Sequence, residues 1–288
     1  MIYPFMEKHS KTFPVVKMAQ IFEIHRSDYY AWKNKASLRN HKGKEDQRLI
    51  KKIEEIQKKS KNSFGSPRMT DKLKSEGESI NHKKVSRLMR ENRLNFKKKK
   101  KYKVTTESNH KKPVAPNILN RDFHAEIPNH KWVSDITYIQ TAEGWLYLCV
   151  ILDLYSRKVV GWAVSSRIDS DLILKAFWAA VILRNPPKGL IFHSDRGVQY
   201  CSDRFRNALK SRGMVQSMSR KGNCWDNACS ESFFKSIKTE WLYDEKFRSR
   251  QEARNMVFEY IEVFYNRYRT HSVIGYMAPD EYEFKRVA

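Results

Sequence analysis

The sequence predicts an α/β protein in which a mixed five-stranded sheet with flanking helices follows small all-helical units. Two observations carry this prediction. Apolar residues recur at helical spacing through residues 1–96, whereas short apolar runs typical of strands begin at Trp132 and later alternate with helices. The 288 residues, 40% of them hydrophobic, allow two or three domains with at least one sizeable core. The longest unbroken apolar stretch, residues 145–152, is far shorter than the ~20 residues that span a bilayer, so we expect neither a membrane span nor secretion.

Positive charge is concentrated in the first part of the chain. Residues 1–112 hold 31 basic and 12 acidic side chains, a net +19, and residues 113–288 hold the remaining +5 of the total +24. This division indicates a front that binds a polyanion, with nucleic acid as the leading partner, and a back that acts on it. A solvated basic tail is the alternative, but the helical spacing speaks against it. The four cysteines form no C-x-x-C pair, which indicates reduced thiols in a cytoplasmic protein.

Residues 1–40 are predicted to form a short helix-turn-helix-like segment. Val15, Met18, Ala19 and Phe22 share one helical face. After a break, Ser27 is the expected N-cap of a second short helix that carries two tyrosines and a tryptophan.

Residues 41–96 are predicted to form a three-helix DNA-binding unit. One helix carries the stripe of Leu49, Ile53 and Ile56, a second begins at Ser66-Pro67, and a third begins at Asn81. The third helix turns three apolar residues inward, namely Val85, Leu88 and Met89. Its polar positions are cations that could face DNA phosphates: Lys83, Lys84, Arg87 and Arg90. A solvated helix face is the other interpretation of each of these cations.

Residues 97–125, which open with the lysine run 97–101, are predicted to be a basic linker. The predicted core, residues 126–248, contains strands at 134–140, 145–153, 158–165, 189–194 and 214–219 and helices at 171–183, 203–211 and 227–243. The C-terminal helical extension, residues 249–288, begins with a helix at 251–268. Its expected inward residues are Met256, Tyr260, Val263 and Phe264, and three tryptophans of the core are expected to be buried: Trp145, Trp162 and Trp178.

Three carboxylates stand at ends of the predicted elements. Asp135 opens the first strand, Asp195 closes the fourth, and Glu231 lies near the start of the long helix. Alone, each has an ordinary explanation: a strand-end cap, a turn residue and a helix N-terminal charge. Together they are hard oxygen ligands suited to Mg²⁺ or Mn²⁺, and a pair of such ions can promote phosphodiester displacement.

The motifs around these acids resemble those of a known family. Between Asp195 and Glu231 lie 35 residues, and Lys238 follows Glu231 by seven, two helical turns along the same face. The flanking signatures are W-x-x-D-x-T-Y at 132–138, D-x-Y-S-R at 153–157, H-S-D-R-G-x-Q-Y at 193–200, G-N-x-W-D-N-A at 222–228 and Y-N-x-x-R-x-H at 265–271. With these the chain resembles an insertion-sequence-3 family transposase, specifically the product of that element's second reading frame.

The resemblance implies an RNase H-like core of the integrase type with Asp135, Asp195 and Glu231 as a DDE triad. It implies two Mg²⁺ ions, with Mn²⁺ as a substitute, and Lys238 in contact with the element's terminal DNA. One site would then catalyse hydrolysis that exposes a 3′-hydroxyl and attack of that hydroxyl on another phosphodiester, without a covalent protein–DNA intermediate. The expected partners are double-stranded element-end and target DNA, further copies of the chain, and the first-frame product or a fusion with it.

Several residues of these signatures keep two interpretations. Asp153 is either structural or a further ligand, and His193 either lines the site or packs beneath it. The segment 225–227 either faces DNA or forms a tight turn capped by Asn227. Arg269 and His271 contact either a phosphate or the underside of the site. Cys224 and Cys229 have poor spacing for zinc.

Two other functions compete with transposition. A DNA-binding regulator with an idle catalytic domain would bind without turnover, and an RNase H-type nuclease would cut the RNA strand of hybrids without joining. The intact triad spacing argues against the first and the basic helical front against the second.

Overall fold

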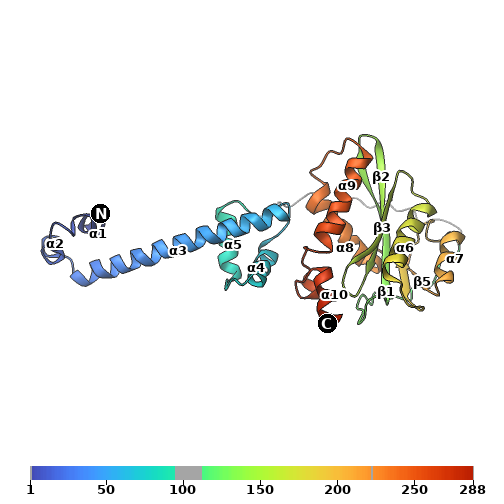
Figure 1. The fold of residues 1–288 in the computed structure, drawn as a ribbon, viewed down its shortest axis with the longest axis horizontal. Helices are drawn as coiled ribbons and strands as arrows, with labels where there is room; N and C mark the ends of the chain where they lie inside the picture. Colours follow the sequence, from blue (N-terminus) through green and yellow to red (C-terminus); the bar gives the residue numbers. More distant parts are fainter. Residues whose placement is uncertain (1, 95–111, 222, 288) are drawn as a thin grey trace. The chain divides into compact units, whose positions relative to one another are not determined.

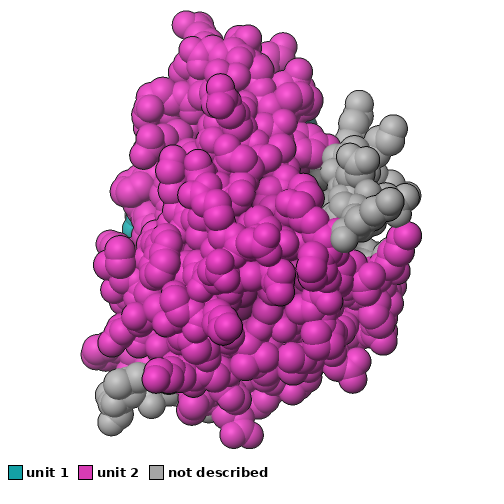
Figure 2. Space-filling view, turned by 90° about the vertical axis from the view of Figure 1, so that its right-hand side faces the viewer, with its two compact units in different colours: residues 1–59, 65–95 teal, residues 60–64, 96–288 magenta. Residues whose placement is uncertain are grey.

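The computed structural model describes residues 2–94, 112–221 and 223–287, so the lysine run 97–101 lies outside the described residues. The chain folds into two compact units, each with most of its contacts within itself. Unit 1 comprises residues 1–59 and 65–95, and unit 2 comprises residues 60–64 and 96–288 (Figure 2). None of the described helices is both long and apolar enough to cross a membrane.

Unit 1 begins with α1 (Ile2–His9), α2 (Val15–Ile21) and α3 (Arg26–Lys59). The prediction of a second short helix followed by a separate one is wrong, because α3 runs without interruption for 34 residues. The sequence between the two expected helices contains no proline to end a helix, and its one glycine, Gly43, is tolerated within it. Where the three helices meet, a small cluster of Met6, Met18, Ala19 and Tyr29 is buried.

The rest of unit 1 follows the predicted three-helix pattern. α4 (Ser66–Ser75) has Pro67 in its first turn, and α5 (His82–Glu91) is capped by Asn81, whose side chain accepts a 2.8 Å hydrogen bond from the backbone N–H of Lys83. The predicted inward residues of α5 are all buried, as is the apolar stripe of α3. Burial of these two faces against α4 is what stabilises the unit.

Unit 2 is built on a five-stranded sheet, as predicted. Its strands are β1 (Lys131–Thr141), β2 (Gly144–Asp153), β3 (Val159–Ser165), β4 (Ile191–Ser194) and β5 (Val215–Met218), in the order β3-β2-β1-β4-β5. β1 pairs antiparallel with β2 and β2 with β3, whereas β1–β4 and β4–β5 are parallel. A hairpin turn at Gly144, with φ near +100°, joins β1 to β2, a conformation that favours glycine.

Helices cover both faces of this sheet (Figure 1). α6 (Ser170–Arg184) and α7 (Asp203–Ser211) lie on one side and enclose the main apolar core with β1–β4. On the other side are α8 (Ala228–Ile237), α9 (Arg250–Phe258) and α10 (Pro279–Val287). Short 3-10 turns, η1 (Cys224–Asn227) and η4 (Ser272–Ile274), precede α8 and α10.

Two predicted continuous helices change character partway. α8 passes into a π-helical segment, η2 (Lys238–Leu242), and α9 into another, η3 (Glu259–Tyr265). The wider π turn shifts which residues align, so Ile261 and Tyr265 are buried while Val263, expected inside, is 54% exposed. The prediction that Trp145 and Trp178 belong to the core is also wrong, since both are exposed at the surface.

Candidate active site

Asp135 and Asp195 are brought together by the parallel pairing of β1 with β4. Ser134 on β1 lies opposite Ser194 on β4, so the next residue of each strand places the two aspartates side by side. The Asp135 carboxylate accepts a 2.8 Å hydrogen bond from the N–H of Ile136, and that of Asp195 accepts a 2.9 Å bond from the N–H of Gly197. Asp135 lies inside β1 rather than at its start, because the strand begins three residues earlier than predicted.

The electrostatics of the site link four charged residues. Burial raises the pKa of Asp135 well above its usual range, the negative charge of Asp195 adds to this, and Glu231 contributes in the same direction. The positive charge of Lys238 opposes the shift. Asp195, Glu231 and Lys238 lie 60, 96 and 103 positions from Asp135 in the sequence, and all three act on its carboxylate.

Glu231 occupies the first turn of α8, where the partial positive charge of the helix terminus favours an acid. Its side chain is exposed at the surface, although partial burial still raises its pKa. Within the described ranges, no group of three or more His, Cys, Asp or Glu side chains is arranged to hold a metal ion. The structure thus brings Asp135 and Asp195 together and places Glu231 within electrostatic reach of Asp135, without a three-acid cluster among the described residues.

Lys238 is a buried cation at the edge of this group. Only 6% of it is exposed, and its Nζ lies 4.9 Å from the ring centroid of Tyr138, the last residue of the W-x-x-D-x-T-Y signature. Burial lowers the pKa of Lys238 to about 8, while the charge of Asp135 works in the opposite direction. Because Lys238 begins η2, the π-helical segment sets where its side chain points.

The donor set fits a hard divalent cation. Burial and the charge of Asp195 raise the pKa of Asp135, the backbone holds the two carboxylates next to each other, and a bound cation would remove their repulsion. Their ligand atoms are all oxygen, which suits Mg²⁺ or Mn²⁺ rather than zinc. In the described part of the chain, Cys149, Cys201 and Cys229 are free thiols, as predicted, and they form no metal cluster.

Arg269 is buried, and His271 beside it is half-buried. Arg269 is 3% exposed, and its guanidinium forms two hydrogen bonds of 2.8 Å with the carboxylate of Glu240 and one of 2.9 Å with the Ser236 hydroxyl. Tyr260 donates a further 2.8 Å bond to Glu240, and His271 contacts the guanidinium. The sequence left two roles open for Arg269 and His271, contact with a phosphate or packing, and this placement fits packing.

Asp153 and His193 are both structural in this arrangement. The buried Asp153 carboxylate accepts hydrogen bonds from the backbone N–H groups of Asn129 (2.7 Å) and Tyr155 (3.0 Å). His193 is fully buried between the hydroxyls of Ser217 (2.8 Å) and Ser219 (3.2 Å). Burial lowers its pKa to about 4, so it is neutral at physiological pH.

The cations predicted to face DNA on α5 differ in their surroundings. Lys84 pairs with Glu45 at 2.9 Å, and Arg87 pairs with Asp46 at 2.7 Å and Glu91 at 2.8 Å. Lys83 and Arg90 are exposed. Lys84 and Arg87 therefore already hold α5 against α3, and Lys83 is the more accessible of the predicted contacts.

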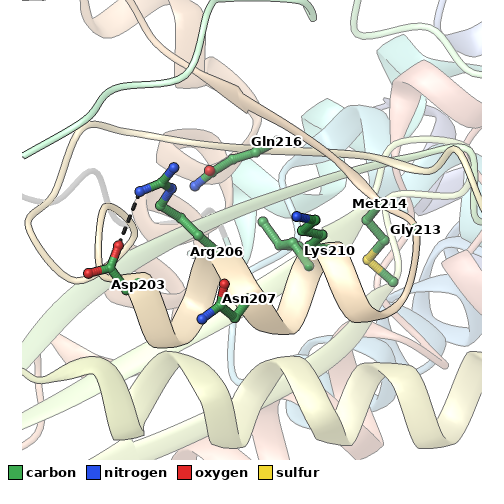
Figure 3. A pocket seen from close by; sticks show the side chains of 8 residues that line it. Asp203, Arg206, Asn207, Lys210, Gly213, Met214 and Gln216 are labelled. Carbon is green, nitrogen blue, oxygen red and sulfur yellow. Dashed lines mark hydrogen bonds and ion pairs between the residues drawn. The ribbon is translucent and has the colours of Figure 1, made fainter.

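A separate hollow lies along α7 and β5 (Figure 3). Its lining includes Arg206, Lys210 and Gln216, and Arg206 pairs with Asp203 at 3.1 Å. It contains none of the residues that sequence analysis assigned to the site.

Comparison with known proteins defines the class of this one. Residues 125–224 and 212–279 match two families described as integrase core domain, and residues 44–102 match an HTH-like domain. Together with the mixed sheet and its paired aspartates, these matches make the chain an integrase-core enzyme, a polynucleotidyl transferase with a helical front.

Full-length relatives specify the family. The chain is 40% identical, over the whole length of both proteins, to the transposase InsF for insertion sequence IS3A of Escherichia coli (strain K12). It is 41% identical to the insertion element IS600 uncharacterized 31 kDa protein of Shigella sonnei, covering 93% of this chain and 98% of that protein. The chain belongs to the IS3 family of transposases, which confirms the resemblance drawn from its motifs. Among solved structures, the HTLV-2 integrase catalytic core domain in complex with magnesium shows a looser likeness, with 18% identity, a TM-score of 0.42 and coverage of 56% of this chain and 99% of that one.

Proposed function

We propose that this transposase cuts and joins DNA at the ends of its own insertion sequence with Asp135, Asp195 and Glu231 as one DDE site. The observation that carries the proposal is the placement of Asp135 beside Asp195 across β1 and β4, with Glu231 and Lys238 acting electrostatically on Asp135. In the first step water breaks a phosphodiester and leaves a 3′-hydroxyl. In the second that hydroxyl attacks another phosphodiester, so one bond forms for each bond broken.

The three carboxylates would hold two Mg²⁺ ions, for which Mn²⁺ could substitute. Divalent ions there would activate the attacking oxygen and stabilise charge on the leaving oxygen. Asp135 and Asp195 are fixed by backbone hydrogen bonds, and Glu231 supplies the third carboxylate from the start of α8. Lys238 places a positive charge beside Asp135, where a phosphate of the element end would be oriented. No side chain is assigned as a covalent nucleophile.

The helical front would hold the DNA. We propose that residues 41–96 form the DNA-binding unit, next to the segment 1–40, and that the linker 97–125 adds contacts to phosphates that do not depend on sequence. The HTH-like match over residues 44–102 and the exposure of Lys83 support this division. Pairing two element ends calls for at least two copies of the chain on DNA. The family resemblance adds the first-frame product as a further partner.

The experiment supplies the chain, with and without its upstream first-frame partner, with a plasmid that carries the flanking element ends. Joined-end circles are then measured with Mg²⁺ present. Asp135→Asn, Asp195→Asn and Glu231→Gln should each abolish circle formation while DNA binding stays close to that of the unchanged chain. Each substitution removes a charged ligand and preserves side-chain size.

Asp203→Asn is the matched control, because the side chain of Asp203 is 87% exposed at the start of α7. This variant should form circles normally. Near-normal joining by any one of the three site variants would remove that residue from the proposed site. DNA binding with no turnover by the unchanged chain and its partner would favour the idle regulator instead.

A further inference from the structure

Trp225 is the most exposed of the seven tryptophans, with 69% of its surface accessible. Tryptophan is usually among the most buried side chains on average, because exposing its indole to water is unfavourable. Trp225 lies in η1, the short turn that leads directly into α8, six residues before Glu231. An apolar ring therefore faces solvent at the entrance to the helix that carries a proposed catalytic acid.

The turn that contains Trp225 is fixed by hydrogen bonds to the next residue, Asp226, whose side chain is completely buried. One carboxylate oxygen of Asp226 accepts hydrogen bonds from the Asn117 amide (3.0 Å) and from the backbone and side chain of Arg220 (both 2.9 Å). The other accepts bonds from Arg121 and Arg220 (both 2.8 Å). Because the turn is already fixed, Trp225 loses little conformational entropy when it binds a ligand.

The residues around this turn carry excess positive charge. One carboxylate serves two guanidinium groups, and the side chains of Arg121 and Arg220 remain 44% and 48% exposed. Lys221, the next residue, is also exposed. The Arg220 and Arg121 interactions hold the pKa of Asp226 far below its usual range, so the carboxylate stays ionised and the arrangement persists.

An exposed aromatic ring with cations around it is the combination of groups found in binding sites for unpaired nucleotides. Such sites stack bases on aromatic faces and neutralise the phosphates with nearby cations. An apolar protein partner would cover the ring but would also have to desolvate two guanidinium groups, whereas a DNA strand uses both features. The surface therefore favours nucleic acid over protein.

We propose that Trp225 stacks on an unpaired nucleobase of the DNA strand at the active site, while Arg121 and Arg220 contact the adjoining phosphates. This inference rests on the proposed function and deepens it, because it assigns a specific contact for the DNA end. Asp226 is a positioning residue in this scheme, since it fixes the two arginines and the turn.

The test measures binding of the full-length chain without divalent ions, so that no DNA is cut. The probes are a mixed-sequence blunt duplex and the same duplex with a short unpaired extension that carries 2-aminopurine. Trp225→Ala should weaken binding to the extended duplex by about 5- to 150-fold, the range expected for loss of one base–aromatic stack, and leave blunt-duplex binding unchanged. Quenching of the 2-aminopurine fluorescence should be lost as well, and Trp225→Phe should retain most of both signals.

Trp178→Ala is the control, because Trp178 is an exposed tryptophan on α6, 40% accessible and outside the turn. It should bind both probes like the unchanged chain. The proposal is overturned if Trp225→Ala binds the extended duplex normally, if it weakens both probes equally, or if Trp225→Phe is as weak as Trp225→Ala. Since binding is measured without strand joining, failure of the proposed catalytic site would leave this result readable.

Discussion

Asp135 illustrates how a single residue can be costly for the fold and useful for chemistry. Burial and the charges of Asp195 and Glu231 act against its ionised form, whereas the backbone N–H of Ile136 and the charge of Lys238 favour it. A carboxylate placed there for stability alone would be a poor choice, because desolvated like charges repel each other. This unfavourable placement of two like charges is explained if a divalent cation normally binds between Asp135 and Asp195.

Asp135→Asn should therefore make the protein more stable while it removes activity. Without divalent ions, we expect the free energy of unfolding to rise by about 1 kcal/mol, because the amide is uncharged and nearly the same size. Added Mg²⁺ should raise the melting temperature of the unchanged chain and have a smaller effect on the variant. Thermal unfolding with and without Mg²⁺ checks this, with Asp203→Asn as the control. A variant less stable than the unchanged chain would mean that Asp135 contributes to the fold in its ionised form.

At this scale the sequence predicted that Asp135 and Asp195 would converge, but not what the other side chains contact. The spacing and flanking motifs identified Asp135 and Asp195, and parallel strand pairing places them together. The surroundings of Lys84 and Arg269 could not be predicted, because their acidic partners lie 39 and 29 residues away and local patterns carry no such information. The exposure of Glu231 likewise depends on how α8 packs against the sheet.

Among the elements, the strands and the helix positions of unit 2 were predictable, whereas the uninterrupted length of α3 and the π-helical character of η2 and η3 were not. Strand alternation and capping residues such as Asn81 and Ser202 leave clear local signals, and α7 begins and ends where predicted. The π-helical segments η2 and η3 have no comparable signal. They pack on each other through Trp241, Tyr260 and Phe264, so tertiary contacts rather than local propensity stabilise them.

The buried Glu240–Arg269 pair links η2 to the loop that follows η3, and its loss should be strongly destabilising. Arg269→Met removes the counter-charge that Arg269 gives the buried Glu240, which should lower the free energy of unfolding by about 3–5 kcal/mol. Combining it with Glu240→Gln, which keeps an acceptor for the Tyr260 hydroxyl, should recover part of this loss. Denaturant unfolding of the two single variants and the double variant measures the coupling. Additive losses would show that the pair contributes nothing as a pair.

Unit 1 contains an ion pair between elements that should make its stability depend on pH. Arg48 on α3 forms two 2.6 Å hydrogen bonds with Glu78, in the loop between α4 and α5, and Lys52 pairs with the same carboxylate. The Arg48 and Lys52 interactions lower the pKa of Glu78 to about 2. Because the folded pKa lies below the unfolded value, the stabilisation is present above pH ~4.5 and is lost as the pH falls towards 2.

Amide hydrogen exchange in α5 provides the measurement for this ion pair. In the unchanged chain, protection should fall between pH ~4.5 and 2 once the intrinsic exchange rate is taken into account. Glu78→Gln should show weaker protection at neutral pH and a smaller change over that range. If the two proteins show the same pH profile, other carboxylates control acid unfolding of this unit.

The net charge of the chain differs between the helical front and the integrase-core part. The net +19 of residues 1–112 coincides with the helical front and the start of the linker, while the integrase-core part carries only +5. In a nearly balanced core, acids can be kept for metal binding, and the DNA-binding front proposed above would supply the attraction for DNA. Composition alone predicted this division, since it depends on counts of charges and not on how they are arranged.

The salt dependence of DNA binding should reveal which part of the chain neutralises the backbone phosphates. For duplex DNA, the slope of log affinity against log salt becomes shallower by about 0.9 for each phosphate that the protein no longer neutralises. Changing the five lysines at positions 97–101 to glutamine should reduce the slope by about 3–4 if most of them bind phosphates. The matched control changes five exposed lysines of the integrase core to glutamine: Lys175, Lys188, Lys210, Lys235 and Lys246. Its slope should change far less, and equal changes in the two variants would show that the core shares the electrostatic binding equally with the basic linker.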